Sequence, residues 1–345
     1  MNKKKISILI PVLNSGSVLE KCLESISNQD YPKEDIEIII ADGGSSDDSL
    51  DIAGRYGAFI VSNVLKTGEA GKMTALKAAS GEYIALIDSD NILPDKNWLK
   101  SMILPLEENI NVLGSEPISY TWRKEDGYIT RYCSLMGMND PLVYFLGNYD
   151  RHNILSGKWT EVEREEKDCG EYIKIIFTKF PLPTIGANGT IFRSEYIKKY
   201  TDRDYLFDID ILSEELKKTG KVEFIKVKTG IIHTFCESDV SKFIRKQIRR
   251  VRDYNYYSLK KNIREYNWNS MDISGKKPWG IIKFSIYCVL IFPLVAQSIT
   301  GFLKKRDYAW FFHIPACILT FLIYSWYRLF GYIYTKEMDR IKWKQ

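Results

Sequence analysis

The sequence is poor in the residues that build metal clusters and disulfide frameworks. Among its 345 residues there are six cysteines and three histidines. No two cysteines form a C-x-x-C pair, and their wide spacing fits neither a zinc site nor a dense set of disulfides. The cysteines are Cys22, Cys133, Cys169, Cys236, Cys288 and Cys317. This usage favours a reducing, cytoplasmic location for the soluble part of the chain.

Several other signals are absent. The chain has no internal repeat and no long low-complexity linker. Asn14–Ser17 is a poor version of the glycine-rich, basic loop that binds the triphosphate in nucleotidyltransferases. The apolar run Ile6–Val12 follows a basic N-terminus, but it is short and no small-residue cleavage site follows it. It therefore predicts a buried first strand rather than a signal peptide.

The formal net charge of +5 is small but unevenly placed. Lys242–Arg264 contains nine basic residues and one acid, Asp253. Such a block can contact phosphates of a nucleotide, a lipid or a nucleic acid, or it can form a solvated helix face. Its apolar positions predict an amphipathic helix that could also rest on anionic lipid. Those positions are Phe243, Ile248, Val251 and Tyr254.

Two long apolar runs lie near the C-terminus. Phe284–Leu303 and Tyr308–Tyr327 are each 20 residues long, and roughly 20 helical residues cross a bilayer. The alternative is a pair of buried or interfacial helices. The basic loop Lys304–Arg306 favours that alternative, because it would lie outside the cell if both runs crossed and the main domain were cytoplasmic. We expect membrane association with the main domain facing the cytoplasm, by either arrangement.

The first hundred residues alternate apolar strands with helical periodicity. The expected strands are Ile6–Pro11, Ile36–Ala41, Ala58–Ser62 and Tyr83–Ile87, and the expected helices are Ser17–Asn28, Ser49–Tyr56, Lys72–Ala79 and Asn97–Glu108. This alternation predicts an α/β fold with a parallel sheet and helices on both faces. Ligands bind at the carboxyl ends of such strands. The polar residues there are Asn14, Asp42 and the Asp88–Asp90 cluster.

Two acidic motifs follow strands. In Asp88-Ser89-Asp90, two carboxylates one residue apart can hold Mg²⁺ or Mn²⁺, which would neutralise charge on a leaving diphosphate. In the segment Asp42–Asp48, a carboxylate can accept hydrogen bonds from a base or ribose, and glycines allow close backbone approach. Both motifs also suit turns and helix caps.

The order and spacing of these segments resemble those of family-2 glycosyltransferases. The residues that carry the resemblance are Pro11–Asn14, Cys22–Ile26, Gln29, Tyr31-Pro32, Asp42–Ser45, Gly71-Lys72, Ala75 and Asp88–Asp90. It covers about the first 100 residues and resumes near Thr184. The resemblance implies a GT-A nucleotide-diphospho-sugar transferase fold, which is a Rossmann-like mixed sheet flanked by helices. It also implies an inverting mechanism and a divalent metal, Mg²⁺ or Mn²⁺.

The resemblance also implies roles for single residues. The donor-binding residues would be Pro11, Asn14, Asp42, Gly43, Lys72, Asp88, Ser89, Gln247 and Arg250. Asp90 would ligate the metal directly, and Asp88 would contact the ribose or a metal-bound water. His233 would complete the metal shell or touch the diphosphate, although a structural role also suits it. Ser15 stands where many relatives carry an acid, which leaves the choice of nucleoside open.

The resemblance continues in two later segments. Ile185–Thr190 is similar to the glycine-containing loop that shapes the sugar and acceptor pocket through Gly186, Ala187 and Asn188. Leu206–Ile211 is similar to the segment with the catalytic base. Because Phe207 replaces the usual Glu, the base is assigned to Asp208, with Asp210 second. An inverting transfer needs such a carboxylate to take the proton of the acceptor hydroxyl. The alternative for Asp208 is a helix N-cap.

The segment Arg245–Arg250 resembles the Q-x-x-R-W motif of processive relatives at Gln247 and Arg250. Val251 stands where the Trp would be, so processivity is not expected. The cations would still clamp the donor diphosphate, because a guanidinium matches phosphate oxygens in a bidentate manner.

These observations lead to one functional hypothesis. We expect an inverting glycosyltransferase that moves a sugar from a nucleotide-sugar donor to a lipid-linked or membrane-proximal glycan, in cell-surface polysaccharide or protein glycosylation. Alternatives are a nucleotidyltransferase-like enzyme and a non-catalytic sugar-nucleotide-binding membrane scaffold. A nucleic-acid partner is not expected.

The expected domains follow the same division. They are a catalytic domain (1–240), a basic amphipathic segment (241–278), two hydrophobic membrane helices (279–335) and a polar tail (336–345). The catalytic domain comprises a nucleotide-binding half (1–100), an insertion of loops with a helix or two that covers the acceptor side (110–180), and an acceptor and base half (181–240).

Overall fold

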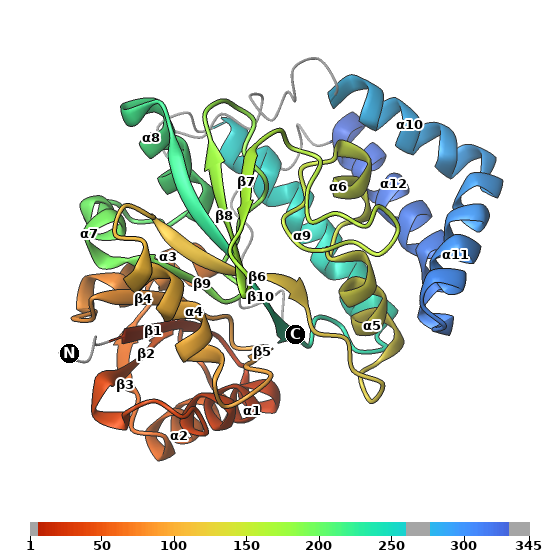
Figure 1. Cartoon of the computed structure of the whole chain (residues 1–345). Helices are drawn as coiled ribbons and strands as arrows, with labels where there is room; N and C mark the ends of the chain where they lie inside the picture. The colour runs from red at the N-terminus through yellow and green to blue at the C-terminus, as the bar shows by residue number, and fades with distance from the viewer. Residues whose placement is uncertain (1–5, 260–276, 331–345) are drawn as a thin grey trace.

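The protein is built on one mixed sheet with helices on both faces, and its C-terminal helices pack beside that sheet (Figure 1). The computed structural model describes residues 6–259 and 277–330. The strands are β1 (Ile6–Val12), β2 (Ile36–Asp42), β3 (Phe59–Ser62), β4 (Tyr83–Leu86), β5 (Asn91–Ile92), β6 (Gly114–Tyr120), β7 (Glu165–Asp168), β8 (Tyr172–Phe177), β9 (Thr190–Arg193) and β10 (Val222–His233).

The α-helices pack on this sheet or beside it. They are α1 (Gly16–Ser27), α2 (Ser49–Arg55), α3 (Gly68–Ala78), α4 (Trp98–Glu108), α5 (Tyr128–Met136), α6 (Pro141–Leu146), α7 (Ser194–Ile197), α8 (Asp208–Thr219), α9 (Val240–Leu259), α10 (Lys277–Leu290), α11 (Phe292–Lys304) and α12 (His313–Phe330). Within the described ranges, three short 3-10 helices complete the elements: η1 (Lys33–Asp35), η2 (Lys198–Tyr200) and η4 (Tyr308–Phe312).

The strand order is β3-β2-β1-β4-β9-β6-β10-β8-β7. Strands β3, β2, β1 and β4 are parallel, as the alternating sequence pattern predicts. Strand β9 runs antiparallel to both β4 and β6, and β10 runs parallel to β6. The expectation of an α/β fold with a Rossmann-like mixed sheet is confirmed.

Strand β1 shows why both faces are covered. Ile8 and Ile10 pack in one core cluster with Leu23 of α1 and Met102 of α4. Leu9, between them, belongs to the cluster on the opposite face with residues of α3. A strand buried on both faces reads as a continuous apolar run, which is the pattern of Ile6–Val12.

Two expectations about the helices and strands are wrong. Helix α3 begins one turn before Lys72, because Thr67 caps it by accepting a hydrogen bond from the Ala70 backbone N–H at 3.1 Å. Residues 110–180 hold more than loops and helices, since they supply the central strand β6 and the β7–β8 pair. The division of the chain into domains remains a prediction.

The first C-terminal apolar run is not one continuous helix. Helices α10 and α11 meet at an angle of 95°. The break lies at Ile291, whose φ is 62°, and Pro293 follows in the first turn of α11. The second run forms a 23-residue segment, Tyr308–Phe330, which is long and apolar enough to cross a membrane. Residues 279–330 thus contain parts of three α-helices, α10, α11 and α12, and the expected pair of membrane helices remains a prediction. Residues 331–345, with the expected polar tail, and 260–276 lie outside the described residues.

Close approach between strands yields a first prediction. A Cβ at Gly114 would lie 2.5 Å from the Ile191 carbonyl oxygen, whereas a Cβ at Gly54 in α2 meets nothing within 4 Å. We expect Gly114→Ala to lower the free energy of unfolding by about 1–3 kcal/mol, because β9 must move away from β6. The matched Gly54→Ala change should raise it by about 0.5–1 kcal/mol. Urea denaturation of both variants measures the difference, and equal midpoints would contradict the packing at β6.

Candidate active site

The ends of β1 and β2 support one shared loop. The Asp42 carboxylate accepts hydrogen bonds from the backbone N–H groups of Gly44, at 2.9 Å, and Ser45, at 3.1 Å. Asn14, with a φ of 47°, accepts from the Ser46 N–H at 2.8 Å through its side-chain oxygen. Both residues therefore order the loop after β2. Their expected contact with a nucleoside remains a prediction, as does that of Ser89.

Two small contacts shape the same strand ends. The Gly43 N–H donates to the Val12 carbonyl at 2.8 Å. A Cβ at Gly71 would lie 2.9 Å from the Cβ of Pro11, so helix α3 approaches β1 closely at this glycine. This approach brings the next residue, Lys72, to the edge of the sheet where the acidic side chains lie.

Lys72 connects two of the expected acidic residues. Its Nζ lies 3.9 Å from Oδ1 of Asp88, after β4, and 3.7 Å from Oδ2 of Asp208, at the start of α8. Three segments far apart in sequence therefore meet at one ammonium group. Burial tends to lower the pKa of Lys72, but the two carboxylates outweigh it and raise this pKa.

Asp208 has the features of a proton acceptor. Its side chain is 10% exposed, and its Oδ1 is buried without a hydrogen-bond partner among the described residues. Burial raises the pKa of Asp208 to about 6, with Lys72 opposing this shift and Asp88 adding to it. The cap position of α8 belongs to Phe207, so the helix-cap alternative for Asp208 is wrong. Asp210 is buried two residues further along the same helix.

Asp90 is held by two cationic or ionisable partners. His233, at the end of β10, places Nε2 3.3 Å from Oδ1, and Lys246 of α9 places Nζ 3.3 Å from Oδ2. Burial opposes ionisation, but His233 and Lys246 together hold the pKa of Asp90 far below its ordinary value. Sequence reasoning named His233, but it assigned Lys246 to the diphosphate clamp and not to Asp90. The available signal was its helical phase, three residues after the buried Phe243.

The neighbouring residues expected to clamp a diphosphate make other contacts. Gln247 donates to the Asn139 carbonyl at 2.9 Å, and Arg250 donates to the Gln247 side-chain oxygen at 2.6 Å. Tyr324 of α12 donates to that same oxygen at 3.1 Å and to Asp140 at 2.6 Å. Gln247 and Arg250 therefore tie α9 to α12, and their role as donor ligands remains a prediction.

The acidic residues fit a metal only in part. No group of three or more His, Cys, Asp or Glu side chains that could hold a metal occurs within residues 6–259 and 277–330. Asp90 and His233 nevertheless offer one oxygen and one nitrogen donor 3.3 Å apart, with Asp88 in the same turn. Mg²⁺ is commonly bound by one or two carboxylates together with substrate phosphates rather than by an all-protein cage. This donor set fits a metal that a diphosphate completes.

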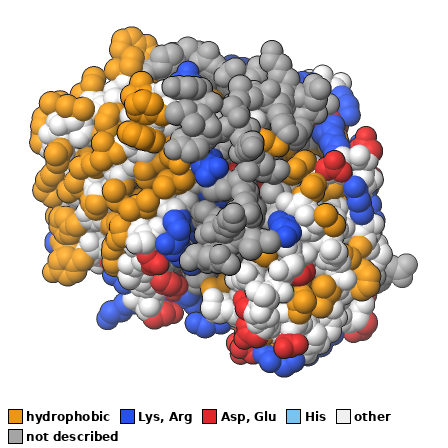
Figure 2. Space-filling view, turned by 180° about the vertical axis from the view of Figure 1, so that it is seen from behind, with side chains coloured by type: hydrophobic (Ala, Val, Ile, Leu, Met, Phe, Trp, Pro, Cys, Tyr) orange, Lys and Arg blue, Asp and Glu red, His pale blue; other side chains and the backbone are white. Residues whose placement is uncertain are grey.

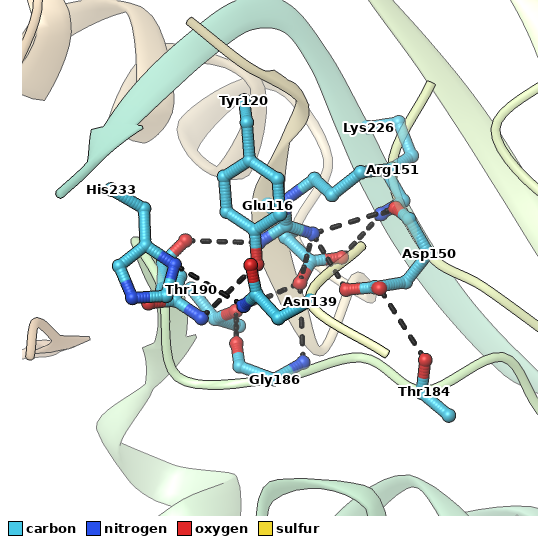
Figure 3. Close-up of polar contacts among 11 residues, drawn as sticks. Glu116, Tyr120, Asn139, Asp150, Arg151, Thr184, Gly186, Thr190, Lys226 and His233 are labelled. Atoms are coloured by element: carbon cyan, nitrogen blue, oxygen red, sulfur yellow. Dashed lines mark hydrogen bonds and ion pairs between the residues drawn. The ribbon is translucent and has the colours of Figure 1, made fainter. Parts of the chain in front are cut away.

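A buried charge cluster supports the expected sugar-pocket loop (Figure 3). Three charged side chains are fully buried: Glu116 of β6, Lys226 of β10, and Arg151 from the segment between α6 and β7. Glu116 forms ion pairs with both cations, and it accepts hydrogen bonds from the Gly186 N–H and the Thr190 hydroxyl, each at 3.2 Å. The cluster thus fixes both ends of the loop 186–190 to the sheet.

The same loop is connected to the Asp90 site. Arg151 donates to the Asn188 carbonyl at 2.9 Å, and the Asn188 side chain donates to the Tyr120 hydroxyl at 3.2 Å. The Tyr120 ring lies 5.5 Å from the His233 ring, and the two are drawn side by side in Figure 3. The structure therefore places the expected residues Gly186, Ala187 and Asn188 on one loop that reaches toward His233.

Asp150 is a further acid of this region that sequence reasoning missed. Its carboxylate lies 2.9 Å from Arg151 and accepts from the Thr184 hydroxyl at 3.4 Å. Burial raises the pKa of Asp150 to about 7, with Arg151 opposing and Glu116 adding to the shift. A single charge within a mixed aromatic and polar segment gave no periodic signal that could have identified it.

Comparison with known proteins gives a consistent assignment. The family model described as Glycosyl transferase family 2 matches residues 7–201. The poly(ribitol-phosphate) beta-glucosyltransferase of Bacillus spizizenii is 41% identical over 103 residues, which are 28% of this chain and 16% of that protein. The GalNAc(5)-diNAcBac-PP-undecaprenol beta-1,3-glucosyltransferase of Campylobacter jejuni is 34% identical over 96 residues, 26% of this chain and 30% of that protein. The chain thus spans less than a third of either relative.

A solved structure resembles the whole arrangement. The mannosyltransferase PcManGT from Pyrobaculum calidifontis, in complex with GDP-Man and Mn²⁺, superposes with a TM-score of 0.52 and 15% identity. The match covers 94% of this chain and 88% of that one. At this level of identity the likeness shows the fold, and it confirms the GT-A architecture expected from the sequence.

The buried cluster gives a second prediction. Removing one partner of a buried ion pair leaves an uncompensated charge, so Glu116→Ala should lower the free energy of unfolding by about 3–5 kcal/mol. The matched change is Glu20→Ala, which removes a surface ion pair to Arg55 in which both side chains are more than half exposed. That change should cost at most about 1 kcal/mol. Chemical denaturation compares the two, and a similarly small effect for both would rule out the cluster as an anchor.

Proposed function

The chain belongs to glycosyl transferase family 2, and we propose that it transfers a sugar from a nucleotide-sugar donor to a lipid-linked or membrane-proximal glycan, with inversion at the sugar carbon. The observation that carries this proposal is Asp208. It is a buried carboxyl with a pKa of about 6, and one of its oxygens lacks a hydrogen-bond partner among the described residues. It lies across Lys72 from Asp88.

The donor would lie along the ends of the parallel strands. Asp42 and Asn14 stand at the ends of β1 and β2, where nucleotides bind in sheets of this kind. Asp90 and His233 would hold Mg²⁺ or Mn²⁺ together with the diphosphate. When bound, such a metal supplies positive charge that stabilises the leaving diphosphate. The solved mannosyltransferase with GDP-Man and Mn²⁺ supports a donor of this class.

Asp208 would act as the general base. Its carboxylate would accept the proton of the acceptor hydroxyl as that oxygen attacks the sugar carbon from the face opposite the diphosphate. The Lys72 ammonium, 3.7 Å from Oδ2, would keep the carboxylate oriented while Oδ1 stays available for the acceptor. Catalytic carboxylates whose pKa lies near the working pH are well suited to this exchange.

The acceptor would approach through the loop 186–190. The Campylobacter relative acts on a glycan carried by PP-undecaprenol, as its name states, which supports a lipid-linked acceptor here. The proposed location is the membrane, with the catalytic part on the cytoplasmic side. Apolar helices at the C-terminus would then hold the enzyme beside its acceptor and raise the effective concentration of that acceptor.

The direct test measures nucleoside diphosphate released from a panel of sugar nucleotides, with Mn²⁺, Mg²⁺ or a chelator and a membrane extract as acceptor source. We expect metal-dependent release from one donor. Asp208→Asn should lower kcat by about 10²–10⁴-fold with little change in the KM for the donor, because it removes the proton acceptor. The matched Asp204→Asn change, at an exposed acid in the preceding loop, should leave kcat unchanged.

Two results would count against the proposal. Donor binding without turnover in every combination of metal and acceptor would favour the non-catalytic scaffold. An Asp208→Asn variant as active as the unmodified enzyme would remove the base from this residue and leave Asp210 as the alternative.

The raised pKa of Asp208 predicts a pH profile. The base must be ionised, and its pKa is about 6 rather than 3.8. The ratio kcat/KM should therefore be flat above pH 7 and fall about tenfold per pH unit below about pH 6. Initial rates across pH 4.5–8 measure this limb. A profile that stays flat down to pH 4.5 would show that no group with this pKa limits catalysis.

A further inference from the structure

Helices α10 and α11 expose a row of large apolar side chains. We call this row the outer apolar face, and it consists of Trp279, Ile282, Ile286 and Val289 on α10 and Phe292, Val295, Ile299 and Leu303 on α11. Each is at least 37% exposed, and Trp279, Val289 and Phe292 are about 70% exposed. Figure 2 shows a broad hydrophobic area on this side of the molecule. Soluble proteins rarely leave such patches uncovered.

The spacing of these residues makes the face one-sided. They recur every three or four positions, which puts them on a single stripe of each helix. The opposite stripes pack against the protein. On α10, Phe284 lies 5.1 Å from the Phe145 ring of α6. On α11, a Cβ at Gly301 would lie 2.4 Å from the Trp310 ring of η4. The two helices are therefore docked on the protein and cannot turn the apolar stripe inward.

Their geometry does not suit a membrane crossing. Helices of 14 and 13 residues are each about 20 Å long, which is shorter than the roughly 30 Å hydrocarbon core. The angle of 95° between them prevents one straight span. The geometry instead suits shallow insertion of the outer apolar face of α10 and α11 into a membrane.

Helix α12 is long enough to cross but is held against polar parts of the protein. Its Tyr324 donates hydrogen bonds to Asp140 and to Gln247 of α9. The Tyr327 carbonyl accepts from the side chain of Asn255, one turn after Arg250 and Val251 on α9. Arg250 of α9 also interacts with Tyr324. If α12 crossed the membrane with these partners, the charges of Asp140 and Arg250 would enter the hydrocarbon, which is costly.

Within residues 277–330, the exposed charged side chains are cations. The cations of the segment 277–330 are Lys277, Lys283, Lys304, Lys305, Arg306 and Arg328, and its one acid is Asp307. Asp307 is buried, accepts from the Trp122 indole at 2.7 Å and pairs with Arg131 at 3.0 Å. Exposed cations such as Lys305 and Arg306 therefore stand at the end of α11 without an exposed acid in this segment. This arrangement complements anionic lipid headgroups.

We propose that the outer apolar face inserts into one leaflet of an anionic phospholipid bilayer, and that residues 277–330 do not cross the membrane. The proposal rests on the proposed function only for the reason why the protein would bind this leaflet, which is that a lipid-linked acceptor would lie there. Binding to lipid requires neither donor nor sugar transfer. Helix α9 connects the two regions, because it contributes Lys246 to the Asp90 site and contacts α12 through Gln247.

The first test measures sedimentation of the full-length protein with phosphatidylcholine vesicles, with and without phosphatidylglycerol. We expect binding that is stronger when phosphatidylglycerol is present. The double change Val289→Asp with Phe292→Asp should weaken it at least ~10-fold, because two charges would enter the hydrocarbon. The control Ile110→Asp alters an apolar residue that is 75% exposed outside the face, and it should bind normally. The pair Lys305→Glu and Arg306→Glu should remove the preference for phosphatidylglycerol.

Two outcomes would overturn the docking surface. The double variant could bind as tightly as the unmodified protein. Alternatively, the unmodified protein could ignore vesicles and form a dimer that the double variant loses, which would assign the face to a second copy of the chain. Asp208→Asn should bind vesicles normally, so a failed transferase assay and a failed lipid assay remain separate results.

The second test distinguishes insertion into one leaflet from spanning. Cys169 is partly exposed on the catalytic body, whereas the other five cysteines are buried. In sealed inside-out membrane vesicles from cells that express Arg306→Cys, a membrane-impermeant maleimide should modify Cys169 and the new cysteine equally without detergent. If the new cysteine reacts only after the vesicles are permeabilised, the α11–α12 loop lies on the far side and the chain spans.

Discussion

The buried carboxylate of Glu116 is the constraint on which the central part of the molecule depends. It forms ion pairs with both Arg151 and Lys226 in a fully buried region, and it accepts hydrogen bonds from two positions of the loop 186–190. Strands β6 and β10, the loop and the segment of Arg151 therefore share one electrostatic centre. A buried charge is tolerated only when its partners are complete, so these segments must fold together. This requirement also fixes the position of the loop 186–190 beside His233.

The acidic residues of the candidate site are likewise paired with cations. Lys72 stands between the carboxylates of Asp88 and Asp208, and Lys246 stands beside Asp90. Each acid thus has a cationic partner, and Lys72 is shared by Asp88 and Asp208. The two groups differ in consequence. Asp90 is held ionised, as the proposed metal ligand must be, whereas the pKa of Asp208 is raised to about 6, which suits the proposed base.

Local patterns made the first hundred residues predictable. The strands and helices from β1 to α4 follow hydrophobic periodicity, which needs no knowledge of distant partners. Strand β6 was missed because it pairs with β9 and β10, more than 70 residues further along the chain. Asp88 and Asp90 were identified as candidates at the end of a predicted strand, and Asp208 through the family resemblance. Glu116 was missed, and the partner of Lys246 was not foreseen, because an ion pair between distant segments leaves no periodic signal.

Helix α9 has a consequence beyond either of its contacts. One end of its polar face holds Asp90 through Lys246, and Gln247, the next residue, binds Tyr324 of α12. A rigid helix cannot move at one of these positions without moving at the other. If donor binds at the Asp90 site as proposed, and if lipid contact shifts α12 and so changes the affinity for donor, thermodynamic linkage requires that donor change the affinity for lipid by the same factor. Helix α9 would then couple membrane binding to donor binding, so that each would change the affinity for the other.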